Sequence, residues 1–417
     1  MATGVTDRHG DKTTARAFGI AYEGKKDTDA ILAAAPADFE RIPGSSGTNT
    51  FYYGDNLQAL RHLLRHGHSG TVRLVYIDPP YATKSAFLNR NQQHAYSDSL
   101  TGADYIEFLR ERIIFIRELL ADDGSIYLHL DGNMAFPMKL IMDEIFGEGN
   151  CRAFITRKKC STKNYTRKTF GNISDYVMFY SKTANYVWNR PFDPWDEARM
   201  LKEYPYVSED GRRYKKVPIH APGVRNGATG EMWKGMMPPE GKHWQYTPDK
   251  LTQLDEAGDI YWSPNGNPRR KVYCTPDKGI PIQDIWLNYR DSANQQLKTT
   301  GYPTEKNANM LRMIVEASSN KGDTVMDCFA GGGTTLGAAQ ELGRTWIGAD
   351  NSPESLAAVI RRFHCGLQNY GDYVNKPFIQ EELALNLPAE HQPFTLLAEK
   401  TLRQTASEIF SSTAAQV

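Results

Sequence analysis

The sequence has few cysteines, no excess of charge of either sign and no long apolar run. Its five cysteines show neither a C-x-x-C pair nor a Cys/His cluster with zinc spacing, so no disulfide framework and no metal site are predicted. Reduced thiols indicate a cytosolic protein, and neither a secretory signal nor a membrane-spanning run is expected. Lys+Arg and Asp+Glu number 49 each, so only local patches can argue for nucleic-acid binding.

Strand and helix patterns alternate along most of the chain. Apolar runs that fit buried strands lie at 72–77, 125–130 and 345–349, with another short strand from 324. Helical periodicity is found at 104–121, 136–146 and 307–319. This alternation predicts a parallel sheet with helices on both faces. The polar segment 1–47 is expected to be a flexible arm, and 371–417 an extension with a helix near 394–410.

One predicted strand ends in a group of side chains suited to chemistry. The run Val72–Ile77 is followed by Asp78-Pro79-Pro80-Tyr81, and the prolines end the strand because they cannot donate to a sheet ladder. This tetrad resembles the catalytic motif of the DNA methyltransferases that modify adenine N6 or cytosine N4. The chemistry fits, because Asp78 and the Pro79 carbonyl can each accept an N–H of an exocyclic amine, and Tyr81 can stack on a flipped base. Taken alone, the tetrad fits an Asp-Pro turn equally well.

A glycine-rich turn supplies the second half of the predicted site. Residues 327–335, Asp-Cys-Phe-Ala-Gly-Gly-Gly-Thr-Thr, follow a short strand and lead into a helix, and Asp350 ends the next strand. A dinucleotide-binding loop is disfavoured because Leu336 stands in place of its last glycine, and the lysine of a P-loop is missing. The turn closely resembles the D-P-F-A-G-S-G-T-T cofactor loop of the same methyltransferases, with Cys328 in place of proline and Gly332 in place of serine.

The order of the motifs is that of the β class of amino-group DNA methyltransferases, which includes the Mod subunits of type III restriction systems and solitary enzymes. The resemblance implies a doubly wound, Rossmann-like α/β fold with circularly permuted motifs, and S-adenosylmethionine as the cofactor. It divides the chain into a catalytic half at 48–150, an inserted target-recognition domain at 151–300 and a cofactor-binding half at 301–370.

The resemblance also assigns roles to individual residues. Catalytic roles fall to Asp78, Pro79, Pro80 and Tyr81. Cofactor binding falls to Asp55, Thr304, Asp327, Phe329, Ala330, Gly331, Gly333, Thr334 and Asp350. Asp55 also fits a plain helix N-cap, and Thr334 or Thr335 can cap the helix after the glycine loop. Thr304 belongs to a stretch similar to the family's helix-leading motif, Tyr302-Pro303-Thr304-Glu305-Lys306, where Asn307 then replaces the usual proline.

Basic residues gather in the middle of the chain. Those predicted to contact DNA phosphates are Arg157, Lys158, Lys159, Lys163, Arg167 and Lys168. A solvated charged face is the alternative. The polar segment 82–100 predicts a lid that orders on DNA, or plain surface. The Trp- and Tyr-rich segment 185–295 predicts a small β-rich or mixed domain, with the aromatics forming its own core rather than base-stacking platforms.

The predicted function is methyl transfer from S-adenosylmethionine to adenine N6 in duplex DNA, by base flipping and direct in-line displacement. Asp at the first tetrad position favours adenine, because cytosine N4 enzymes more often carry Ser there. The alternatives are cytosine N4, an RNA or protein glutamine substrate, and a DNA-binding protein with a silent methyltransferase fold. The Pro-Cys motif of cytosine C5 enzymes is absent. Expected partners are duplex DNA, a second copy of the chain and a restriction or defence-system subunit, with no membrane. The protein is expected to be bacterial, archaeal or phage-encoded and to act in the cytoplasm.

Overall fold

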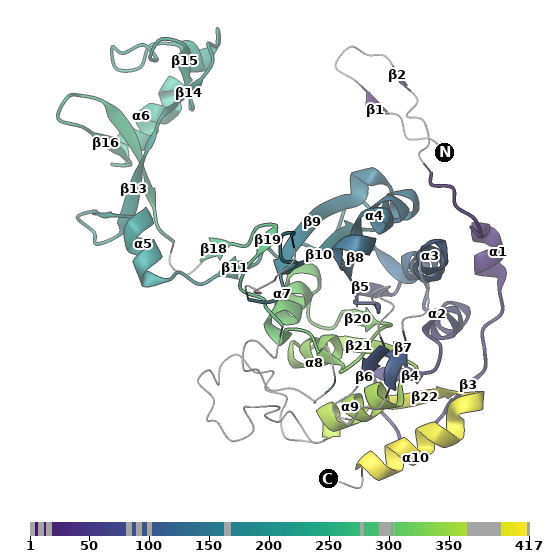
Figure 1. Cartoon of the computed structure of the whole chain (residues 1–417). Coiled ribbons are helices and arrows are strands. Elements are labelled where there is room, and N and C mark those ends of the chain that lie inside the picture. The colour runs from purple at the N-terminus through teal and green to yellow at the C-terminus, as the bar shows by residue number, and fades with distance from the viewer. Residues whose placement is uncertain are drawn as a thin grey trace. The chain divides into compact units, whose positions relative to one another are not determined.

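A computed structural model describes residues 5–6, 12–13, 19–80, 86–88, 94–97, 102–161, 168–275, 279–291, 302, 305–364 and 393–414. The chain forms two compact units (Figure 1): Met1–Pro191 with Gln283–Val417, and Phe192–Ile282. Among the residues described, no helix is long and apolar enough to cross a membrane.

The larger unit is built on a ten-stranded sheet. In spatial order its strands are β19 (Ile285–Trp286), β9 (Cys151–Lys158), β10 (Ser174–Ser181), β8 (Leu120–Leu130), β5 (Val72–Ile77), β20 (Thr324–Asp327), β21 (Thr345–Asp350), β4 (Thr50–Tyr53), β22 (Thr395–Glu399) and β3 (Phe39–Arg41). The run from β8 to β22 is parallel, so the carboxyl ends of these strands meet at one edge. β10 is antiparallel to both of its neighbours.

Helices cover both faces of this sheet (Figure 1). One group is α1 (Thr28–Ala33), α2 (Asn56–Arg65), α3 (Ala103–Leu119) and α4 (Gly132–Phe146), which contact one another through α3. The other group is α7 (Ala308–Ser318), α8 (Thr334–Glu341), α9 (Pro353–His364) and α10 (Arg403–Ala414). The predicted doubly wound α/β fold is therefore confirmed, including its permuted order, because β5 and β20 are neighbours in the sheet although they are far apart in sequence.

Both chain ends contribute strands to this sheet, which corrects two predictions. β3 lies within the segment predicted to be a flexible arm, and β22 occupies the first part of the predicted helix at 394–410. Phe394, Leu396 and Ala398 are buried in alternation, which is the two-residue period of a strand. The helix begins only at Arg403.

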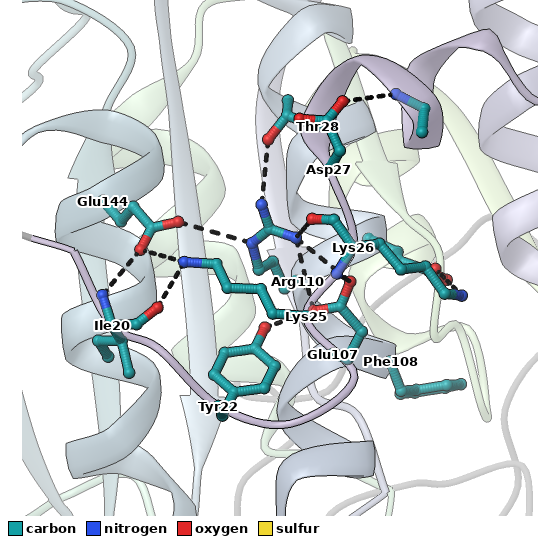
Figure 2. Close-up of polar contacts among 12 residues, drawn as sticks. Ile20, Tyr22, Lys25, Lys26, Asp27, Thr28, Glu107, Phe108, Arg110 and Glu144 are labelled. Carbon is teal, nitrogen blue, oxygen red and sulfur yellow. Dashed lines mark hydrogen bonds and ion pairs between the residues drawn. The ribbon is translucent and has the colours of Figure 1, made fainter.

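The segment that leads into α1 is fastened to α3 and α4 by charged side chains (Figure 2). Tyr22 donates to Glu107 on α3, and Lys25 Nζ lies 2.8 Å from Glu144 Oε2 on α4. Arg110 connects the two acids, with 3.2 Å from Nη1 to Glu107 Oε1 and 3.7 Å from Nε to Glu144 Oε1. Arg110, whose side chain is only 4% exposed, also donates to the carbonyl of Lys26 and the hydroxyl of Thr28, both at 3.0 Å, so it joins the segment directly to α3.

The smaller unit contains a four-stranded antiparallel sheet. Its order is β12 (Tyr206–Val207), β13 (Arg213–Pro218), β17 (Pro268–Tyr273) and β16 (Ile260–Trp262). The other elements are β11 (Phe192–Asp193), α5 (Glu197–Glu203), β14 (His220–Pro222), β15 (Lys242–Trp244), α6 (Pro248–Glu256), β18 (Ile280–Pro281) and a 3₁₀ turn at Ala228–Gly230. Trp233 and Trp244 lie in its apolar core with Ile219, Leu251, Leu254 and Ile260.

The compact unit is narrower than the predicted insert at 151–300. β9 and β10 fall inside that range, yet they belong to the ten-stranded sheet. The recognition role of the insert stays a prediction. The remaining short elements are the strand pairs β1 (Val5–Thr6) with β2 (Lys12–Thr13) and β6 (Ala86–Leu88) with β7 (His94–Ser97), and 3₁₀ turns at Glu148–Asn150 and Lys400–Leu402. Most of the predicted lid at 82–100 lies outside the described residues.

Candidate active site

Five neighbouring parallel strands carry an aspartate at or just past their carboxyl ends. These are Asp131 after β8, Asp78 after β5, Asp327 in β20, Asp350 in β21 and Asp55 after β4. Adjacent strands lie about 4.8 Å apart, so the Asp-Pro-Pro-Tyr tetrad and the glycine loop begin from neighbouring positions. This is the edge at which open α/β sheets bind ligands.

Asp78 is held by a lysine and faces a buried histidine. Lys306 Nζ lies 2.8 Å from Asp78 Oδ2, and His129 Nδ1 lies 3.7 Å from Asp78 Oδ1. The register pairs Ile77 of β5 with Leu128 of β8, which places Asp78 and His129 at the next step along both strands. Neither Lys306 nor His129 was among the predicted site residues. A histidine inside the apolar run 125–130 was an available signal, because buried polar groups need partners.

His129 continues a polar chain into the sheet. Its Nδ1 lies 2.7 Å from Tyr76 Oη, and its Nε2 lies 3.0 Å from Asp175 Oδ2. Burial raises the pKa of Tyr76 well above its ordinary value, so the phenol keeps its proton and can donate to the imidazole. Burial alone would also raise the pKa of Asp175, but His129 and Arg157 outweigh burial and hold that pKa below its usual range.

Arg157 closes this chain and is fully buried. Its Nη1 lies 2.8 Å from Asp175 Oδ2, its Nη2 lies 2.5 Å from Asp291 Oδ1, and its Nε donates to the carbonyl of Tyr289 at 2.7 Å. Burial would lower the pKa of Arg157, but the two carboxylates outweigh burial and raise it. The prediction that Arg157 contacts DNA phosphates is therefore wrong, because its charge is already neutralised inside the sheet.

Among the other residues predicted to contact DNA, Lys158 ends β9 and Lys159 follows it. Lys158 and Lys159 are half-buried and Lys168 is exposed. Lys163 and Arg167 lie outside the described residues. A DNA contact at these four lysines and this arginine stays a prediction.

The glycine loop needs two of its glycines for steric reasons. Gly331 has φ +49° and Gly333 has φ +71°, a left-handed region that side chains other than glycine rarely adopt. A Cβ at Gly331 would lie 3.1 Å from the Tyr302 ring, and a Cβ at Gly333 would lie 3.0 Å from Val359 Cγ2. Both glycines are therefore required by the turn itself and by its close packing against Tyr302 and Val359.

A buried arginine on α9 braces the same loop. Arg362 donates from Nε to the carbonyl of Gly332 at 2.8 Å and from Nη2 to Glu305. The hydroxyl of Thr334 also donates to Glu305, at 3.3 Å. The prediction that Thr334 or Thr335 caps α8 is wrong, because the N-cap is Gly333, which has no side chain. Sequence reasoning missed Arg362, which lies inside an ordinary helical pattern.

Of the two acids beside the loop, Asp327 is buried and Asp350 is half-buried, and they differ in their partners. Asp327 accepts the N–H of Phe329 at 3.0 Å, and burial, reinforced by the nearby acids Asp78 and Asp350, raises the pKa of Asp327 to about 7. Asp350 accepts the N–H of Gly331 at 2.9 Å, and burial raises the pKa of Asp350 as well. Ala330, between them in the loop, is buried.

Two motif positions have structural partners of their own. Asp55 caps α2 by accepting the N–H of Gln58 at 3.1 Å, and its other oxygen lies 3.2 Å from Arg112 Nη2. The helix-cap interpretation of Asp55 is confirmed, and its cofactor contact stays a prediction. Asn307, the departure from the family's proline, caps α7.

The tetrad is described as far as its second proline. Pro79 is buried, and the carbonyl of Pro80 accepts a 2.7 Å hydrogen bond from Tyr105 on α3. Tyr81 and Thr304 lie outside the described residues. The structure thus brings together Asp78, Asp327, Asp350 and the glycine loop.

Comparison with known proteins identifies the family. The family model described as DNA methylase, N6_N4_Mtase, matches residues 72–361. The chain belongs to this family of N6/N4 DNA methyltransferases. A type II methyltransferase, M.EcaI of Enterobacter cloacae, is 48% identical over 381 residues, which cover 89% of this chain and 84% of that protein.

Two further relatives are more distant. The StyLTI Mod subunit of a type III restriction-modification enzyme, from Salmonella typhimurium strain LT2, is 28% identical over 332 residues, covering 70% of this chain and 50% of that protein. The solved structure of PvuII DNA methyltransferase, described as cytosine-N4-specific, shows 15% identity and a TM-score of 0.44 over 91% of this chain and 97% of that one. This last likeness is too distant to inform the choice of base.

Proposed function

We propose that this DNA methyltransferase transfers the methyl group of S-adenosylmethionine to N6 of adenine in duplex DNA, with Asp78 and the glycine loop as the two halves of its site. The observation that carries the proposal is that β5 and β20 are neighbours, so Asp78 and the loop after Asp327 leave the same sheet edge side by side. Asp at the first tetrad position supports adenine as the base.

The loop residues fit this cofactor. Asp327 and Asp350 stand at neighbouring strand ends with pKa values raised by burial, so each carboxyl would gain from the cationic and hydroxyl groups of this ligand. S-adenosylmethionine supplies an electrophilic methyl group when bound. We assign Asp350 to the ribose hydroxyls, with further contacts from Asp55, Thr304, Phe329, Ala330 and Thr334.

The catalytic residues act by position and charge. Asp78 and the carbonyl of Pro79 accept the two N–H groups of the amine, which makes the nitrogen more tetrahedral and more nucleophilic. Lys306 at 2.8 Å orients the Asp78 carboxylate, and Tyr105 fixes the peptide of Pro80. Tyr81 stacks on the flipped base. Holding the amine in line with the methyl group supplies most of the rate.

We assign recognition of the DNA sequence to the unit Phe192–Ile282. We also propose a restriction subunit as the companion of the enzyme, because one relative is named as the Mod subunit of a type III restriction-modification enzyme. Nucleoside mass spectrometry of DNA from cells that express the protein, beside an Asp78→Ala control, tests the reaction. N6-methyladenine that appears only with the intact chain supports the proposal. N4-methylcytosine would contradict the choice of base, and an unchanged mark in the control would contradict the role of Asp78.

A further inference from the structure

Positive charge is concentrated on the sheet of the smaller unit. Residues 192–282 hold 14 Lys and Arg against 13 Asp and Glu, so the unit as a whole is nearly neutral. Its four-stranded sheet contains no acid but six basic residues, which are Arg213, Lys215, Lys216, Arg269, Arg270 and Lys271. The balancing acids therefore lie in the helices and loops around the sheet.

The register divides these strands into two faces. Residues paired across antiparallel strands point to the same side, and successive residues alternate. Lys216 pairs with Lys271, and Tyr261 pairs with Arg269. One side, which we name the basic–aromatic face, therefore consists of Tyr206, Tyr214, Lys216, Pro218, Tyr261, Arg269, Lys271 and Tyr273.

Aromatic rings hold the cations of this face. Lys216 Nζ lies 3.7 Å from the ring centroid of Tyr206 and 3.4 Å from that of Tyr261, and Lys271 Nζ lies 5.5 Å from that of Tyr214. Cation–π contacts orient an ammonium group without neutralising its charge. Lys216 and Lys271 stand directly opposite each other, an arrangement that costs stability between neighbouring strands unless an anion relieves it.

The other face of the same sheet is directed inward. Ile260 belongs to the apolar core of the unit, and Arg270, its cross-strand partner, donates to the hydroxyl of Tyr246. Lys215, the neighbour of Lys216, lies 4.0 Å from Glu203. Among the described residues, Lys216, Arg269 and Lys271 of the basic–aromatic face form no ion pair, whereas Lys215 on the inner face does.

We propose that the basic–aromatic face binds the phosphates of duplex DNA, an inference that rests on the proposed function as a DNA methyltransferase. Cations two residues apart on a strand are separated by about 7 Å, and those on adjacent strands by about 5 Å. Duplex DNA presents a phosphate charge every ~1.7 Å along its axis, so Lys216, Arg269 and Lys271 can each meet a different phosphate. This contact is additional to the one that the sequence predicts at Lys158, Lys159, Lys163, Arg167 and Lys168.

Salt-dependent DNA binding by the full chain tests this assignment. The probe is a fluorescein-labelled 30-base-pair duplex of mixed sequence, followed by anisotropy between 50 and 400 mM NaCl. Each phosphate contact contributes about 0.9 to the slope of log affinity against log salt, so the triple variant K216Q/R269Q/K271Q is expected to lower that slope by about 2 to 3. Its affinity near 0.1 M salt should fall at least ~10-fold.

Lys215→Gln is the matched control, because it removes the same charge from the adjacent residue on the other face. Its slope should stay at the wild-type value. Equal slopes for the triple variant and the wild type, with unchanged unfolding temperatures, would overturn the assignment. The assignment would also be overturned if the triple variant kept its affinity for duplex DNA but lost binding to duplex RNA of the same length.

Methylation assays separate this inference from the proposed function. The triple variant should keep the maximal rate of methyl transfer at low salt and saturating DNA, while KM for DNA rises. If the wild type methylates DNA and the triple variant binds DNA as tightly as the wild type, only the assignment of DNA binding to the basic–aromatic face is overturned. If the wild type binds DNA through this face but transfers no methyl group to the DNA, only the proposed function is overturned.

Discussion

Replacing Asp327 with Asn should abolish the pH dependence of cofactor binding near neutrality. Asp327 ends β20 beside the glycine loop, and its burial next to Asp78 and Asp350 raises its pKa from 3.8 to about 7. A ligand that carries positive charge binds the protein better when Asp327 is ionised, so the fraction of wild-type protein that binds the cofactor well grows as pH rises.

The expected change follows from this pKa. With a pKa of about 7, the ionised fraction of Asp327 rises ~25-fold between pH 5.5 and 7.5, and the apparent affinity for S-adenosylmethionine should rise in proportion. Isothermal titration calorimetry at several pH values measures this increase. The Asp327→Asn protein should bind weakly and with a flat pH profile.

The stability of the cofactor-free protein should change in the opposite direction. Between pH 4 and 7 the folded state keeps the Asp327 proton and the unfolded state does not, so stability falls as pH rises, by about 1.4 kcal/mol per pH unit and about 4 kcal/mol in all. Asp327→Asn should lack this loss, and its unfolding temperature should overtake that of the wild type above pH 6. A wild-type affinity that is equal at pH 5.5 and 7.5, or an Asn variant with the wild-type profile, would refute the reasoning.

Three further substitutions test other contacts. Lys306→Met should lower the rate of methyl transfer ~10- to 100-fold, because Asp78 loses a charged partner at 2.8 Å, while calorimetry shows cofactor affinity within about twofold. Arg110→Leu should destabilise the protein by about 3–5 kcal/mol in urea unfolding, since Glu107 is left buried without its cation. Gly331→Ala should weaken cofactor binding at least ~10-fold by calorimetry, because of strain and contact with a ring.

Each of these substitutions has a matched control. Lys306→Arg keeps a cation near Asp78 and should recover part of the lost rate. Arg117→Leu changes the same helix as Arg110→Leu, but that side chain is 40% exposed and its loss should cost less than about 1 kcal/mol. Gly343 also has a positive φ, at +74°, but a Cβ there would meet only Lys321, at 3.8 Å, so Gly343→Ala should leave cofactor affinity unchanged. Equal effects in a variant and its control would contradict the assigned contact.

The sequence was sufficient for the centre of the fold because each central element carries its own local signal. β5 is an apolar run stopped by prolines, and α7 has helical periodicity with an Asn cap. The glycine loop was predictable because positive φ and close packing restrict two positions to glycine. β22 was missed because Phe394–Phe410 contains enough apolar residues to imitate a helix, and only the burial alternation shows the strand.

The charged contacts were less predictable because they depend on distant partners. Arg157 stands in a run of basic residues that resembles a DNA-binding surface, yet Asp175 and Asp291 neutralise it inside the sheet. Lys306 reaches Asp78 across more than half of the chain. Composition and spacing do not encode such pairings, which only the folded sheet creates.

The most direct test of the central claim, that Asp78 and the glycine loop form one methyl-transfer site, uses purified protein. Transfer of tritiated methyl groups from S-adenosylmethionine to duplex DNA is compared between the wild type and Asp78→Asn, whose shape is nearly the same. The account predicts that Asp78→Asn binds cofactor and DNA as the wild type does and loses at least ~100-fold in rate, the size of a catalytic hydrogen-bond contact. A variant that transfers methyl groups at the wild-type rate would contradict it.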